Sequence, residues 1–76
     1  MIISKKEEMQ RRYPEGTKIE LIFMDGEPQM YRGLQGTVEY IDDIGQIHMK
    51  WENGSSLALV QGVDRFRKAR EGVTNN

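Results

Sequence analysis

The sequence predicts a mainly β protein: one small domain of five short strands, preceded by a short N-terminal α-helix. Residues 36–60 carry the main observation, because they contain three runs of alternating apolar and polar residues separated by two glycine-bearing turns. That arrangement is typical of a β-meander. The length of 76 residues is the second observation, because a chain this short forms one domain with a thin core. We therefore expect a single domain over residues 1–70.

The second turn of the meander sets the pairing of its middle and last strands. A three-residue loop at 52–54, with its glycine in left-handed backbone, places Met49 opposite Leu57. The same loop places Ile47 opposite Leu59. A shorter Asn-Gly loop would pair both leucines with polar side chains, since a slip of one residue exchanges the two faces of a strand. The three-residue loop is therefore preferred.

The first turn of the meander can be tested in the same way. A four-residue loop at 42–45 brings Val38 opposite Met49. It also brings Tyr40 opposite Ile47. The face of the meander that we expect to be buried comprises Val38, Tyr40, Ile47, Met49, Leu57 and Leu59.

A helix over about residues 4–13 is predicted before the sheet. Ser4, followed three residues later by Glu7, forms a capping box that satisfies free backbone donors at a helix start. Met9 and Tyr13 then share one face of the helix. A helix this short is marginal alone, so we expect it to pack on the sheet.

Two further strands flank the meander. Residues 17–23 alternate as a first strand, and residues 24–34 read as a long loop because they contain Asp-Gly, proline and glycine. Residues 65–68 form a short closing strand around Phe66. The core-facing residues expected in the first strand are Ile19, Leu21 and Phe23. Residues 71–76 have little apolar content, so we expect a disordered tail.

This order of elements is that of a small five-stranded SH3-like barrel, in which closure of the sheet removes exposed edges. The run GLQGTV at residues 33–38 follows one strand after GTKIE at residues 16–20. Together these runs resemble the KOW-type glycine pattern of ribosomal and transcription-elongation barrels.

A longer resemblance covers about residues 3–67. Residues 12–25 (RYPEGTKIELIFMD), residues 33–60 and the run GVDRF at residues 62–66 resemble the small bacterial and phage family catalogued as domain of unknown function number 4314. The resemblance implies a small stand-alone protein, frequently from mobile elements. It implies no activity and no catalytic residues. We expect residues 24–31 of the long loop to vary within the family, so that this loop sets partner choice.

The composition excludes several classes of protein. The absence of cysteine and the presence of a single histidine argue against a disulfide framework and a zinc site, and they fit a reducing cytoplasm. The apolar runs at 21–24 and 57–60 are far shorter than the roughly 20 residues of a membrane span. Charge follows directly after residues 1–3, so no secretion signal is expected. We expect a cytoplasmic protein without a cofactor.

The net charge of −1 conceals a segregation along the chain. Residues 1–14 carry a charge of +2, residues 15–64 carry −6, and residues 65–76 carry +3. The body is therefore acidic and both ends are basic. One interpretation is that the ends fold back and neutralise the body. The other is that the basic ends contact a partner.

Candidate protein-binding residues lie in the long loop and beside the second hairpin turn. Met24, Met30 and Tyr31 would give an adaptable apolar surface if the loop is exposed. The alternative is that they close the end of the barrel. Trp51 ends its strand next to the turn, where a place at the edge of the core would leave part of its ring free for a contact.

A basic cluster at the C-terminal strand is the candidate for nucleic-acid binding, because basic stripes contact phosphates. It comprises Arg65, Arg67, Lys68 and Arg70. The acidic body opposes such binding. Single-strand binders also stack bases on aromatic residues, and Phe66 is expected to be used in the core.

No catalytic or metal-binding constellation stands out. Asp42 and Asp43 lie in a turn and are too few for a calcium loop. His48 is expected to face outward without the neighbours of a catalytic base. We therefore expect no enzyme activity and no metal.

The sequence thus predicts a non-catalytic protein-interaction module of unidentified partner, with nucleic-acid binding possible and no membrane association. The first alternative is a KOW-like nucleic-acid contact through the basic strand. The second is a mobile-element inhibitor that docks on a basic host protein. The oligomeric state is left open by the sequence.

Overall fold

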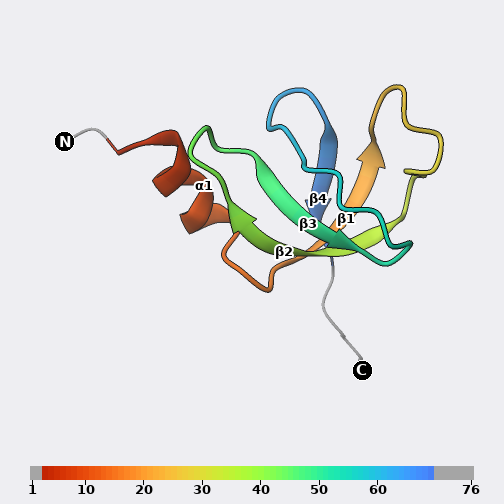
Figure 1. The fold of residues 1–76 in the computed structure, drawn as a ribbon, viewed down its shortest axis with the longest axis horizontal. Helices are drawn as coiled ribbons and strands as arrows, with labels where there is room; N and C mark the ends of the chain where they lie inside the picture. Colours follow the sequence, from red (N-terminus) through yellow and green to blue (C-terminus); the bar gives the residue numbers. More distant parts are fainter. Residues whose placement is uncertain (1–2, 70–76) are drawn as a thin grey trace.

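The computed structural model describes residues 3–69 and has one short helix and four strands. The elements are α1 (Lys5–Arg12), β1 (Lys18–Phe23), β2 (Gln35–Ile41), β3 (Ile47–Trp51) and β4 (Arg65–Lys68). The strands form one antiparallel sheet in the order β3-β2-β1-β4. Figure 1 shows α1 beside one end of β2 and the loop between β1 and β2 at the opposite end of the molecule. The mainly β fold is confirmed.

The predicted fifth strand is reduced to a single bridge. Ile47 and Leu59 exchange backbone hydrogen bonds of 2.9 and 2.8 Å, as the three-residue loop predicted. The neighbouring pair of Met49 and Leu57 is not part of a ladder among the described residues. The reason is local: the Leu57 N–H donates to the Ser55 hydroxyl at 3.2 Å, and such side-chain bonds compete with strand pairing. The sheet therefore has four strands and one added bridge.

The β2–β3 hairpin differs from the prediction by one bulge. Val38 lies opposite Met49, as predicted, but Tyr40 lies opposite His48 instead of Ile47. The register shifts between Val38 and Tyr40, and one extra residue in a strand reverses the faces that follow it. Ile41 therefore takes the buried place, and Tyr40 is 55% exposed.

The first strand shows the same effect at its end. Ile19 and Leu21 are buried as predicted, whereas Phe23 is 54% exposed. The register between β1 and β4 shifts between Leu21 and Phe23. The prediction that Phe23 faces the core is therefore wrong, because alternation does not survive the irregularity.

The capping box of α1 is confirmed. The Glu7 N–H donates to the Ser4 hydroxyl oxygen at 3.0 Å, and the Ser4 N–H donates to a Glu7 carboxylate oxygen at 3.1 Å. Met9 is buried in the core and Tyr13, the C-cap, packs edge-to-face on Phe66 at 5.5 Å. The helix is thus held by its apolar face. Among residues 3–69, no helix has the length and apolar character needed to cross a bilayer.

The core forms one cluster between the sheet, the helix and the long loop. Its residues are Met9, Ile19, Leu21, Met24, Met30, Leu34, Val38, Ile41, Ile47, Met49, Trp51 and Leu59. One close approach inside it depends on a glycine. Gly36 lies opposite Trp51 across the β2–β3 pair, and a Cβ at this position would be 2.7 Å from Trp51 Cε3.

Candidate interaction surfaces

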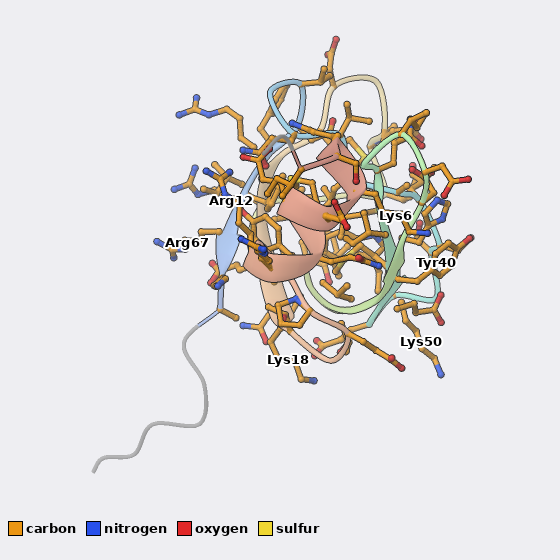
Figure 2. The ribbon with its side chains drawn as sticks, turned by 90° about the vertical axis from the view of Figure 1, so that its left-hand side faces the viewer. Lys6, Arg12, Lys18, Tyr40, Lys50 and Arg67 are labelled. Atoms are coloured by element: carbon orange, nitrogen blue, oxygen red, sulfur yellow. The ribbon has the colours of Figure 1, made fainter. Side chains whose placement is uncertain are left out.

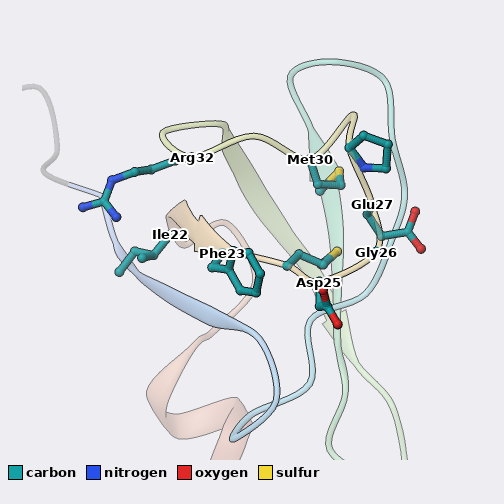
Figure 3. Close-up of a pocket in the computed structure, with 9 residues that line it drawn as sticks. Ile22, Phe23, Asp25, Gly26, Glu27, Met30 and Arg32 are labelled. Atoms are coloured by element: carbon teal, nitrogen blue, oxygen red, sulfur yellow. The ribbon is translucent and has the colours of Figure 1, made fainter.

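An open hollow lies where β1 runs into the loop between β1 and β2. Its volume is about 420 Å³, and we call it the loop hollow. Its apolar lining comprises Ile22, Phe23, Met24, Pro28 and Met30. Figure 3 shows the carboxylates of Asp25 and Glu27 on one side and the guanidinium of Arg32 on the other. The hollow therefore combines an apolar centre with charges of both signs at its rim.

Backbone and side-chain hydrogen bonds position the loop around this hollow. Leu21 donates to the Leu34 carbonyl at 2.8 Å, and Gly33 donates to the Leu21 carbonyl at 2.8 Å. At the other end, Asn53 Nδ2 donates to the Gln29 carbonyl oxygen at 2.9 Å. The long loop is therefore tied both to β1 and to the turn after β3.

The structure changes the interpretation of the predicted protein-binding residues. Met24 and Met30 are 8% and 4% exposed, so the expectation of exposed methionines is wrong. They close the end of the core, which was the alternative, because burying their apolar surface outweighs ordering the loop. Tyr31 is 57% exposed, as expected. The two methionines also line the loop hollow, so they form its floor.

Trp51 lies inside the core and not at its edge. The side chain is 2% exposed, and its Nε1–H donates to the Leu57 carbonyl oxygen at 2.8 Å. A buried indole with a satisfied donor is a packing residue. The expectation of a partly free Trp51 ring is therefore wrong. Phe23, which the sequence analysis assigned to the core, is instead the exposed aromatic residue beside the hollow.

The basic strand is exposed, and its cations have neighbours. Arg67 forms a 3.2 Å ion pair with Glu20, and Lys68 Nζ lies 5.6 Å above the Tyr13 ring. Phe66 packs against the core, as predicted. Arg65 is exposed at the start of the strand. The remaining predicted residue of this cluster, Arg70, lies outside the described residues.

The positions of labelled side chains separate two surfaces. Figure 2 shows Arg12 and Arg67 on the side where β4 lies, while Tyr40 and Lys50 are on the opposite side. The helix arginine and the basic strand therefore lie on the same side of the molecule in this view. Tyr40, the exposed aromatic residue of the β2–β3 hairpin, lies on the opposite side from that strand.

The hairpin turn holds a cluster of polar side chains that the sequence analysis missed. His48 Nε2 lies 2.8 Å from Asp42 Oδ2, and Tyr40 stacks on the His48 ring. Asp42 Oδ1 also accepts the backbone N–H groups of Ile44 and Gln46, at 3.2 and 2.8 Å. The His48 hydrogen bond, followed by these two backbone donors, holds the pKa of Asp42 below its ordinary value of 3.8.

The hydrogen bonds of this cluster hold the turn in place, and they occupy the carboxylate that would otherwise be available to a ligand. Both Asp42 oxygens are occupied within the chain, and among residues 3–69 no group of three metal-ligating side chains converges. A signal for it was available in the sequence, because Asp42 opens the turn and turn aspartates accept nearby backbone donors.

Ion pairs connect the basic ends to the acidic body. Lys6 Nζ is 3.2 Å from Asp43 Oδ1, and Arg67 is 3.2 Å from Glu20. Each pair joins an end segment to residues 15–64. These contacts fit the interpretation that the ends fold back, although exposed pairs of this kind stabilise a fold little.

Comparison with known proteins gives one match. The family model described as "Domain of unknown function (DUF4314)" matches residues 4–69 of the chain. No curated protein and no solved structure matches it.

Proposed function

Because the chain belongs to the DUF4314 family, whose description assigns no activity, we propose a function from its surface: a non-catalytic module that binds a partner protein through the loop hollow. One observation carries the proposal. An open apolar hollow of about 420 Å³ lies beside the exposed ring of Phe23. Exposed aromatic and methionine-lined surfaces of this kind are enriched at protein interfaces.

We further infer that the sheet is a small SH3-like barrel. The order β3-β2-β1-β4, with residues 55–61 returning beside β3, follows the strand order of such barrels. The bridge of Ile47 with Leu59 is the remnant of the additional strand. In this arrangement residues 24–34 form a long loop between β1 and β2, and long loops on a rigid sheet frequently carry binding sites.

The hollow fits an apolar side chain flanked by charge. An aliphatic or aromatic anchor from the partner would lie against Phe23 and reach the sulfur atoms of Met24 and Met30. Methionine repacks readily around such an anchor. A basic group next to the anchor would face Asp25 and Glu27. Tyr31 is exposed and lies between the lining residues Met30 and Arg32 in the sequence. Its rigid ring adds contact area and loses less conformational entropy on binding than a flexible side chain would.

The experiment compares a double variant of the hollow with a matched control. Phe23→Ala with Tyr31→Ala removes two exposed aromatic side chains, so folding should be retained. Ile44→Ala with Val63→Ala removes two other exposed apolar side chains, 71% and 72% exposed, that do not line the hollow. Tagged forms of all three proteins are used to capture partners from native lysate, with and without nuclease and at low and high salt.

We expect a defined protein to remain bound to the parent chain and the control after nuclease and high salt, and to be lost from the hollow variant. Titration with the purified partner should then show binding at least about tenfold weaker for the hollow variant. Equal retention by both variants would contradict the proposal.

A nucleic-acid contact through Arg65, Arg67 and Lys68 is the alternative function. Their exposure supports it, and the ion pair of Arg67 with Glu20 opposes it. The same experiment separates the two functions, because phosphate-driven binding weakens steeply with salt. Captured material that disappears with nuclease or salt would favour the alternative.

A further inference from the structure

The strand β4 forms one edge of the sheet. It pairs with β1 on one side only. Among residues 3–69, no backbone hydrogen bond joins β4 to a segment other than β1. An edge of this kind presents N–H and C=O groups that can pair with another chain.

The hydrogen-bond alternation identifies which groups face this edge. The Ala69 N–H donates to the Lys18 carbonyl oxygen at 2.9 Å. In an antiparallel pair, bonded and non-bonded residue pairs alternate, so Arg67 is also directed toward β1. The backbone groups of Phe66 and Lys68 therefore point away from β1, toward the open edge.

The pairing of β1 with β2 leads to the same assignment. The Leu21 N–H donates to the Leu34 carbonyl, and the Thr17 carbonyl accepts from Val38. Odd-numbered residues of β1 thus face β2, which leaves Lys18 and Glu20 to face β4. Glu20 lies opposite Arg67, so the backbone groups of Arg67 also face β1. Those of its neighbours Phe66 and Lys68 therefore face away from β1.

The exposed side chains of this edge are all cationic. Arg65, Arg67 and Lys68 are exposed, while Phe66 is partly buried against the core. Figure 2 shows β4 at the margin of the molecule with Arg67 directed outward and Arg12 on the same side. The single carboxylate in contact with these cations among residues 3–69 is Glu20. The edge therefore carries a net positive charge.

We propose that β4 binds an extended, acidic segment of a partner protein by strand addition. Main-chain hydrogen bonds to Phe66 and Lys68 supply a docking frame. Carboxylates of the incoming segment then lie beside Arg65 and Arg67, since side chains on adjacent strands stand next to one another. No residue of β4 lines the loop hollow, so the inference goes beyond the proposed function.

The same charges exclude a second copy of this chain. Antiparallel pairing of two β4 strands would place arginine and lysine side chains of one copy against those of the other, and like charges on adjacent strands are destabilising. Cationic edges of this kind resist self-association in general. They remain complementary to an acidic strand.

The test uses a proline at Lys68 and a matched glutamine. Lys68→Pro removes an edge N–H but leaves the β1 pairing intact, because that N–H faces away from β1; edge strands accept proline in this orientation. Lys68→Gln removes the same charge and the same contact with Tyr13 but keeps the N–H. The two variants therefore differ in the backbone donor and not in charge.

The probe is a short fluorescein-labelled peptide of alternating glutamate and valine, titrated by fluorescence anisotropy against each protein. The matching lysine–valine peptide and a labelled oligothymidylate are titrated in parallel. Amide NMR spectra of both variants establish that the fold is kept. The double variant Phe23→Ala with Tyr31→Ala is included because it alters the loop hollow. Phe23 lies opposite Arg65, but the two docking residues of β4, Phe66 and Lys68, lie opposite other residues of β1.

We expect the glutamate peptide to bind the Lys68→Gln form at least about fivefold more tightly than the Lys68→Pro form, the effect of about one backbone hydrogen bond. In the parent protein, the amide signals of Phe66 and Lys68 should shift when the glutamate peptide binds. The Phe23→Ala with Tyr31→Ala variant should bind this peptide as tightly as the parent does. Absence of binding, or equal binding by the two folded Lys68 variants, would overturn the proposal. Oligothymidylate binding without peptide binding would also overturn it and would assign the edge to phosphates.

Discussion

Tyr40 lies flat on the ring of His48, with the ring centroids 4.3 Å apart and the ring planes within 6°. The bulge in β2 creates this pair, because it turns Tyr40 out of the core and opposite His48. The Nε2 atom of His48 lies 2.8 Å from Asp42 Oδ2. A chain of three side chains therefore closes the β2–β3 hairpin on its outer surface, and cross-strand pairs of this kind stabilise sheets.

The first prediction concerns the pH dependence of this hairpin. Asp42 has a folded-state pKa below its ordinary value of 3.8. Its stabilising effect is therefore complete above that value and is lost as the pH falls through the lower, folded-state pKa. Asp42→Asn should melt at a lower temperature than the parent at neutral pH. The difference should shrink as the pH is lowered below 3.8.

Thermal unfolding followed by circular dichroism at a series of pH values measures this difference. Asp43→Asn is the matched control, because Asp43 is an exposed neighbour whose ion pair with Lys6 contributes little. A melting-temperature difference for Asp42→Asn that stays constant down to strongly acidic pH would show that charge on Asp42 does not stabilise the turn.

The second prediction concerns Gly36. An alanine there would place its Cβ 2.7 Å from Trp51 Cε3 and 3.0 Å from the Lys50 carbonyl oxygen. Because the backbone and the indole are both packed, we expect Gly36→Ala to lower the free energy of unfolding by about 1–3 kcal/mol. Urea unfolding in the parent and in a Trp51→Phe background measures the coupling. Equal costs in both backgrounds would mean that the indole is not the obstacle.

The third prediction concerns Trp51 itself. Trp51→Phe removes the donor to the Leu57 carbonyl and part of a buried ring. We expect a loss of about 2–4 kcal/mol in the free energy of unfolding, measured by urea unfolding with circular dichroism. Tyr31→Phe, at an exposed position, should change it by less than about 0.5 kcal/mol. In the folded parent, iodide should not quench the indole fluorescence. Strong quenching would show that Trp51 is accessible after all.

The fourth prediction concerns the start of α1. Ser4→Ala leaves the Glu7 N–H without its acceptor, so the free energy of unfolding should fall by about 1 kcal/mol. Ser4→Asp is the control, since aspartate is an equally good N-cap residue. Urea unfolding of the three proteins decides the question, and an equal loss for both substitutions would argue that the hydroxyl is not acting as a cap.

Local patterns predicted the features that depend on few neighbouring residues. The capping box of Ser4 with Glu7 was one. The pairing of Ile47 with Leu59 was another, since a loop with Gly54 in left-handed backbone, φ 90°, fixes it. In both cases the residues that determine the geometry are adjacent or separated by one turn, so their chemistry is visible in the sequence.

Features that depend on an extra residue in a strand could not be predicted from alternation. Tyr40 and Phe23 were assigned to the core by a period of two, and both lie beyond register shifts that move them to the surface. A bulge is stabilised by the neighbouring strand and loop. The alternation of apolar and polar residues in the sequence does not indicate where a bulge occurs.

Candidate contact residues were assigned to the long loop, but the sequence did not predict which of its side chains are exposed. Met24 and Met30 belong to the loop hollow, yet they form its floor and Phe23 its exposed side. Which side chains of a long loop turn inward depends on the core that the loop covers. Burial of Trp51 was accessible in principle, because the predicted pairing of Val38 with Met49 also places Gly36 opposite Trp51. A small residue there leaves room for the indole.

The pairing of β1 with β4 also bears on how the chain acquires its fold. Glu20 and Arg67, which form an ion pair across these strands, are separated by 47 positions. Contacts between residues so far apart in the sequence slow folding, because bringing the two residues together costs loop-closure entropy before the contact stabilises the chain. The β2–β3 hairpin can form early from neighbouring residues. The central strand β1, by contrast, gains its second neighbour only after residues 65–68 have been synthesised, so the sheet cannot be complete before these residues are available.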